Sequence, residues 1–173
     1  DLGNGLPKYT FGFNFTLGYK GFDLSANFTG AAGFQIAQSY RDPSGSQGNY
    51  SHRILGRWTG EGTSNEMPRV TYGDVGNWLF SDLYLQDGDY IRLQNLTLGY
   101  DFKKLISWKG LSKLRLYFQV QNLFTLTKYD GMDPEIGSYN GTDGNSSDSW
   151  VSGVDMGYYP HPRTFIVGVN VAF

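Results

Sequence analysis

The stretch Tyr9–Tyr19, YTFGFNFTLGY, decides the fold class of this chain. Its odd positions are all aromatic or leucine, whereas its even positions are Thr, Gly, Asn, Thr and Gly. This strict alternation predicts a β-strand with one apolar and one polar face. A tight turn at Lys20-Gly21 follows, and the next stretch, FDLSANFTG from Phe22, alternates in the same way. The two stretches therefore predict a β-hairpin.

Three later segments alternate in a similar manner: YIRLQNLTLGYDF, KLRLYFQVQNLF and the closing FIVGVNVAF. The apolar residues change phase within the first of them, since Ile91 and Leu93 are odd whereas Leu96 and Leu98 are even. This change indicates either a β-bulge or a strand that extends beyond the surface its apolar face contacts. We place the five strands at about 8–19, 22–34, 89–102, 113–126 and 159–173.

The connections between these strands alternate between short and long. Lys20-Gly21 is minimal, and Lys103–Ser112 joins the third and fourth strands, but the other two connections run over about 35–88 and 128–158. Both long connections are rich in Gly, Ser, Asn and Asp, and compact domains rarely carry such loops unless they are functional. Short turns on one side and long loops on the other are typical of outer-membrane β-barrels.

The regular apolar face of the five segments holds no charged residue, although 17% of the chain is charged. A lipid-facing surface requires this, but the core of a soluble β-sandwich excludes charge equally well. The placement of the rings discriminates better, because five of them lie at strand ends on the short-turn side and predict an aromatic girdle at one membrane interface. The girdle residues are Tyr19, Phe22, Tyr100, Phe102 and Phe173.

Five strands cannot close a barrel alone, because an open sheet in lipid leaves unpaired N–H and C=O groups along two edges. Single-chain barrels have at least about eight strands. The sequence therefore predicts an all-β chain, an antiparallel transmembrane β-barrel segment with two long extracellular loops, which belongs to a larger barrel. The alternative is a soluble β-sandwich that binds carbohydrate through the same loops.

Composition argues against several other classes. The 14 Lys and Arg residues against 16 Asp and Glu residues give a net charge of −2, so the basic excess of a nucleic-acid-binding protein is missing. The chain has no cysteine, and its two histidines, His52 and His161, lack a recognisable catalytic partner in the sequence. We therefore predict no catalytic residue, no cofactor and no metal site, and we do not expect an enzyme.

Four blocks, in this order, resemble the C-terminal part of the SusC/RagA family of TonB-linked outer-membrane transporters. They are YKGFDLSANFTG (Tyr19–Gly30), DGDYIRLQNLTLGY (Asp87–Tyr100), LRLYFQVQNLFTLTKYDGMDPEIG (Leu114–Gly137) and YPHPRTFIVGVNVAF (Tyr159–Phe173). A fifth block, RWTGEGTSNEMPRV (Arg57–Val70), is similar to a loop of that family.

The resemblance implies the last five strands of a barrel of about 22 strands, whose lumen holds a plug. It also implies import of a large nutrient, such as an oligosaccharide or a peptide, across a Gram-negative outer membrane. The implied partners are the upstream polypeptide with its plug, a SusD-like surface lipoprotein, TonB acting through that upstream part, and the lipid bilayer. No nucleic acid is implied.

The closing strand resembles the signal that the barrel-assembly machinery reads when it inserts the last strand. The alternative is that its terminal ring only completes the periplasmic-side girdle. The residues of this assembly signal are Phe165, Val167, Val169, Val171 and Phe173.

Aromatic residues in the long connections are candidates for contact with a substrate or a partner, because rings at a barrel mouth can stack on sugars or make large contacts. The alternative is that they pack the loops against each other. The residues concerned are Trp58, Trp78, Tyr84, Tyr129, Tyr139 and Trp150.

Overall fold

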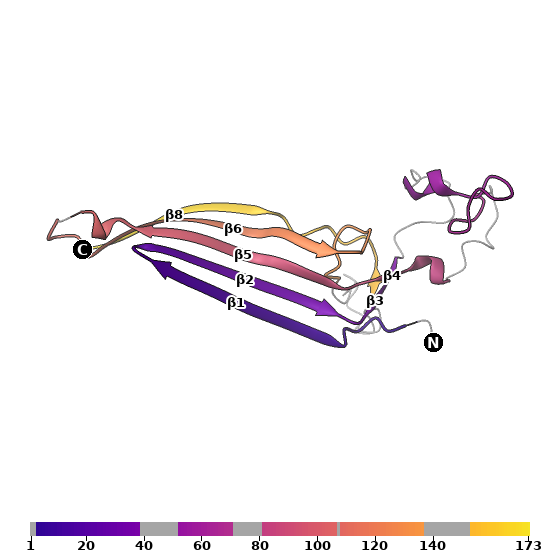
Figure 1. Cartoon of the computed structure of the whole chain (residues 1–173), viewed down its shortest axis with the longest axis horizontal. Helices are drawn as coiled ribbons and strands as arrows, with labels where there is room; N and C mark the ends of the chain where they lie inside the picture. Colours follow the sequence, from indigo (N-terminus) through magenta and orange to yellow (C-terminus); the bar gives the residue numbers. More distant parts are fainter. Residues whose placement is uncertain (1–2, 39–51, 71–80, 107, 137–152) are drawn as a thin grey trace, which may run out of the picture.

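The computed structural model describes residues 3–38, 52–70, 81–106, 108–136 and 153–173. Its main sheet has five strands in the order β1-β2-β5-β6-β8, and every pair of neighbours is antiparallel (Figure 1). These strands are β1 (Tyr9–Tyr19), β2 (Phe22–Ala32), β5 (Tyr90–Asp101), β6 (Lys113–Thr127) and β8 (Thr164–Ala172). The prediction of an all-β chain with an antiparallel sheet is confirmed.

Of the two interpretations of the phase change, the β-bulge is confirmed, at Gln94 on β5. Asn95 pairs with Asn27 of β2 and Leu93 pairs with Phe28, so Gln94 stands without a partner on that side. On the other side, the register with β6 also shifts, between Gln121 and Phe124, and Asn122 in this interval has a left-handed φ of 52°. Because Gln94 is an extra residue in β5, the odd-numbered Ile91 and Leu93 lie on the same face of the sheet as the even-numbered Leu96 and Leu98.

Two of the expected boundaries are wrong by a few residues. The last strand begins at Thr164 rather than at 159, because Pro160 and Pro162 cannot donate to a β-ladder. The second strand ends at Ala32 rather than at 34, because Gly33 adopts a φ of 78° and turns the chain.

The two expected loops, 35–88 and 128–158, contain a second sheet that the sequence does not predict. Its strands are β3 (Gln35–Gln38), β4 (Leu85–Asp87) and β7 (Val154–Asp155), in the order β4-β3-β7. β4 runs antiparallel to β3, whereas β7 runs parallel to it, so the sheet joins segments of both long connections. Three short 3₁₀ helices complete the described elements: η1 (His52–Gly56), η3 (Asp82–Tyr84) and η4 (Phe102–Lys104).

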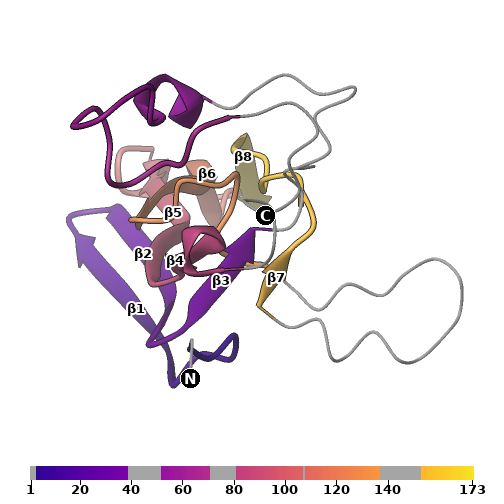
Figure 2. The ribbon, with the colours of Figure 1, turned by 90° about the vertical axis from the view of Figure 1, so that its right-hand side faces the viewer.

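The small hydrophobic core lies between the main sheet and this second sheet. It consists of Ala31, Phe34, Ile36 and Tyr129, with Tyr90 and Ile136 packed against it. Ala31 and Tyr90 pair with each other on the polar face of the main sheet, so the segments that follow the strands fold over that face. Figure 2 shows the molecule from the end that carries the two long connections, where β3, β4 and β7 lie together. In the part of the chain described, none of the helical segments has the length and apolarity to cross a membrane.

Candidate functional site: the two faces of the main sheet

Most of the large side chains on the apolar face of the main sheet are exposed, although Ala26, Leu93 and Val120 on the same face are buried. Cross-strand register places Phe13 beside Phe28 and Leu116 beside Val169, and the same face continues across all five strands. Phe13 is 49% exposed and Val167 is 71% exposed, although both lie in the middle of a strand. No residue on this face of the described strands is charged. The face therefore suits an apolar surrounding, not water.

The rings of the predicted girdle gather at the short-turn end of the sheet. Tyr19 pairs with Phe22, the Phe22 and Tyr100 ring centroids are 4.4 Å apart, and Tyr100 meets the edge of Phe102 at 4.8 Å. Phe173 lies at the same end, where its ring meets that of Trp108 at 6.4 Å.

Trp108 is a ring at this end that the sequence analysis did not assign. It is 61% exposed and lies in the connection between β5 and β6. The signal available in the sequence was the presence of a tryptophan in a short turn on the girdle side, since Trp is enriched at membrane interfaces.

The residues of the predicted assembly signal share the apolar face of β8. Phe165, Val167, Val169 and Val171 pair in turn with Val120, Phe118, Leu116 and Leu114 of β6. Phe173, just beyond the strand, is 84% exposed. Their proposed role in assembly stays a prediction.

The polar face carries an ion pair near the short-turn end. Arg115 Nε donates to Asp23 Oδ1 at 2.8 Å and Arg115 Nη2 donates to Asp23 Oδ2 at 2.5 Å. The pair crosses directly above Gly99, where a Cβ atom would lie 2.5 Å from Arg115 Nη2. The Arg115 guanidinium also lies 5.0 Å from the ring of Tyr117. Glycine is therefore required at position 99 for the arginine to lie flat on the sheet.

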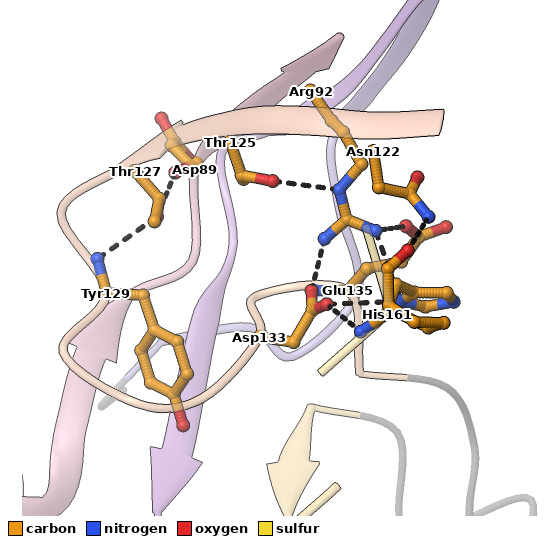
Figure 3. Close-up of polar contacts among 10 residues, drawn as sticks. Asp89, Arg92, Asn122, Thr125, Thr127, Tyr129, Asp133, Glu135 and His161 are labelled. Carbon is orange, nitrogen blue, oxygen red and sulfur yellow. Dashed lines mark hydrogen bonds and ion pairs between the residues drawn. The ribbon is translucent and has the colours of Figure 1, made fainter. Parts of the chain in front are cut away.

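A second, more deeply buried polar cluster lies at the long-loop end of the same face (Figure 3). Its centre is Arg92 of β5, which is only 3% exposed. Arg92 Nε donates to Thr125 Oγ1 at 2.9 Å, Nη1 donates to Glu135 Oε2 at 2.7 Å, and Nη2 donates to Asp133 Oδ1. Arg92 Nη1 also lies 3.2 Å from His161 Nδ1.

Asp133 accepts from both segments that flank the second long connection. Glu135 N donates to Oδ1 at 2.9 Å, and His161 N donates to Oδ2 at 3.2 Å, while His161 Nδ1 lies 3.1 Å from Oδ2. Burial raises the pKa of the Asp133 carboxyl, but the hydrogen bonds from Glu135 and His161 and the charge of Arg92 lower it by more. The net pKa lies below the ordinary value, so Asp133 is ionised at neutral pH.

Asp155, a second buried carboxylate, joins the same two flanks. It is fully buried, its Oδ2 accepts from the Tyr129 hydroxyl at 2.5 Å, and its Oδ1 accepts from Gly157 N at 2.8 Å and Tyr158 N at 3.2 Å. Within the described ranges, no group of three histidine, aspartate or glutamate side chains could hold a metal ion.

The structure separates the aromatic residues expected at the loops. Tyr129 is buried in the core, which fits the packing alternative, and Tyr84 is half-buried, with burial raising the pKa of its phenol. Trp58 is exposed and lies just after η1. Trp78, Tyr139 and Trp150 lie outside the described residues.

An antiparallel sheet with an exposed uncharged apolar face, a polar opposite face and a row of rings at one end is the kind of sheet that forms the wall of a membrane β-barrel. The comparisons with known proteins agree with this class. No protein-family model matches the chain. It is 36% identical to TonB-dependent receptor P3 of Formosa agariphila over 99% of this chain and 17% of that protein.

Other relatives give the same result. The chain is 31% identical to TonB-dependent receptor P26 of Formosa agariphila over 99% of this chain and 18% of that protein. It is 29% identical to TonB-dependent receptor SusC of Bacteroides thetaiotaomicron over 90% of this chain and 14% of that protein.

Solved structures show the same fold. The RagAB peptide importer in its closed-closed state matches with a TM-score of 0.72 and 24% identity, over 98% of this chain and 18% of that chain. In its open-open state the match has a TM-score of 0.70 over 97% of this chain and 17% of that chain. The chain belongs to the SusC/RagA type of TonB-dependent receptors, and it spans less than a fifth of the length of the relatives it matches.

Proposed function

We propose that the chain forms the C-terminal part of the wall of a TonB-dependent importer in a Gram-negative outer membrane. Its five strands belong to a barrel of about 22 strands that closes around a plug supplied by the upstream polypeptide. The apolar face meets the lipid bilayer and the polar face lines the lumen. The girdle lies at the periplasmic interface, and the long connections lie on the extracellular side.

The observation that carries this proposal is the exposed apolar face of the main sheet. Soluble monomers rarely expose contiguous apolar patches of more than about 600 Å². Here the apolar residues of all five strands share one face, and the core cluster of Ala31, Phe34, Ile36 and Tyr129 lies on the other side of the sheet. A soluble β-sandwich would cover that face with a second sheet, whereas the second sheet observed lies at the long-loop end of the polar face.

The cargo of the importer is a large nutrient, an oligosaccharide or a peptide. Support comes from the solved relative described as a peptide importer and from the relative named SusC. The partners are a SusD-like surface lipoprotein, TonB acting through the upstream part, and the barrel-assembly machinery acting on the closing strand. Of the predicted loop rings that the structure describes, Trp58 is the exposed one and is proposed to contact a ligand or a partner. The chain has a transport role and not an enzymatic one.

The test is to recover the native polypeptide from purified outer membranes and measure its mass and its migration. We expect a species several-fold heavier than 19.4 kDa that carries peptides upstream of Asp1 and migrates faster before heating than after heating. A free polypeptide of 19.4 kDa that stays in solution without detergent would reject the proposal and return the soluble carbohydrate-binding module to first place.

A further inference from the structure

The four segments that enter or leave the long connections are bonded to one another, and we call them the loop base. They comprise residues 33–38, 85–89, 129–136 and 153–163. Gly33 N donates to Asp89 Oδ1 at 2.6 Å, and the strands of the second sheet join the first pair of segments to β7. Gln38 Nε2 donates to Asp130 Oδ1 at 2.7 Å, which adds the third segment.

The two flanks of the second long connection are also bonded directly to each other. The Tyr129 hydroxyl donates to Asp155, and His161 N donates to Asp133. Each bond pairs a residue before the connection with a residue after it. Both acceptors are buried carboxylates, Asp133 being 5% exposed and Asp155 fully buried.

Arg92 connects the two hydrogen-bonded flanks to the main sheet. It projects from the polar face of β5, where its backbone pairs with Thr29 of β2 and Thr125 of β6. Its guanidinium reaches Asp133 and Glu135 on one flank and His161 on the other. One side chain thus contacts the wall strand β6 and both flanks at once (Figure 3).

Burial makes this arrangement different from a surface ion pair. Exposed pairs contribute little to stability, but removing one member of a buried pair leaves an uncompensated charge in a low-dielectric site. The side chains of Arg92 and Asp133 are 3% and 6% exposed, whereas those of the other ion pair on this face, Arg115 and Asp23, are 19% and 39% exposed. The two pairs therefore differ in burial and in whether a loop is attached.

We propose that Arg92 is a positioning residue that fastens the loop base to the polar face of the barrel wall. The clamp holds residues 129–136 and 153–163, the two flanks of the second long connection, at a fixed place on the rim. The fastening itself follows from the bonds described, and only its placement at a lumen rim rests on the proposed function.

The test is hydrogen exchange on the full-length protein in detergent micelles, read peptide by peptide by mass spectrometry. Arg92→Met is expected to speed exchange in residues 130–136 and 158–163 by about tenfold or more, because these segments then open independently of the wall. Exchange in the β1–β2 hairpin should not change. Arg92→Lys keeps the charge but loses the planar fork, so it should recover part of the protection, leaving a rise of about threefold.

Arg115→Met is the matched control, since it removes an arginine of the same sheet face that carries no loop segment. It should leave exchange of residues 130–136 and 158–163 unchanged. Unchanged exchange in Arg92→Met, or equal acceleration in Arg115→Met, would overturn the proposal. If Arg92→Met does not fold, Asp133→Asn removes the other side of the clamp, and unchanged exchange there overturns the proposal in the same way.

The same variants separate this inference from the proposed function. Exchange is measured in the folded protein and needs no transport. Local acceleration in a protein that proves not to lie in the outer membrane would support the clamp and reject the transporter, whereas an outer-membrane protein without the local effect would reject the clamp alone.

Discussion

Placing an arginine at position 13 should deplete the folded barrel, because Phe13 faces the proposed lipid side. Phe13 is at the middle of β1 and stacks on Phe28 with ring centroids 4.5 Å apart and planes 11° from parallel. An arginine at mid-depth on the lipid face costs about 2–4 kcal/mol. Loss of the ring pair adds about 0.5–1.5 kcal/mol. The total is roughly 2.5–5.5 kcal/mol, which is a large part of the about 5–15 kcal/mol that stabilises a typical protein.

Asn14→Arg is the control, because the two positions are adjacent in sequence and differ in face. Asn14 pairs with Asn27 on the polar face, which lines the lumen in the proposed barrel. Substitutions at such sites usually change stability by no more than about 0.5 kcal/mol. The assay is the amount of heat-modifiable full-length protein in the outer-membrane fraction, measured for both variants beside the unchanged protein.

The expected result is strong depletion for Phe13→Arg and near-normal content for Asn14→Arg. Equal content of the two variants would mean that Phe13 does not face lipid, and depletion of Asn14→Arg alone would mean that the faces are reversed. Either result refutes the assignment of the two faces.

Three further outcomes are expected. The pKa of Asp133 is lowered in the fold, so the stabilising effect of this carboxylate is present at neutral pH and is lost as the pH falls below the ordinary value of 3.8. Hydrogen exchange of residues 158–163, corrected for intrinsic rates, should therefore accelerate in acid. The substitution Asp133→Asn should abolish that pH dependence. Gly99→Ala should lower the denaturant midpoint by the equivalent of about 1 kcal/mol, since its Cβ would displace Arg115, whereas Gly18→Ala, with its nearest atom 3.9 Å away, should not. Phe173→Ala should slow the appearance of folded barrel in pulse-labelled cells without lowering its denaturant midpoint, and a lowered midpoint with normal assembly would leave only the girdle role.

The strands of the main sheet could be predicted because their signal is local. Alternation along β1 is set by side chains two residues apart, and the observed Tyr9–Tyr19 falls inside the expected 8–19. The bulge at Gln94 was also visible, as a change of phase between Leu93 and Leu96. A period-two pattern reports which face a residue occupies and needs no knowledge of its partner.

The loop base could not be predicted, because it depends on contacts between residues far apart in sequence. Arg92 and His161 are 69 residues apart, and Tyr129 and Asp155 are 26 apart. The strands β4 and β7 have three and two residues, too few to show a periodic pattern. The one available signal was a charged residue, Arg92, on a strand whose polar face otherwise carries mainly small or neutral groups, since such a charge requires a partner if it is buried.

The placement of the core explains why the sheet and the loop base depend on different surroundings. In the part of the chain described, the core cluster of Ala31, Phe34, Ile36 and Tyr129 lies at one end of the polar face, while the larger apolar surface points outward. The edge strands β1 and β8 each have one neighbour, and in the proposed barrel further strands pair with these edges while lipid covers the apolar face. The loop base, in contrast, is held against the polar face by the core cluster and by buried hydrogen bonds to Arg92, Asp133 and Asp155. Loosening the loop base by mutation should therefore leave the wall intact, whereas a charge on the apolar face should prevent both from forming.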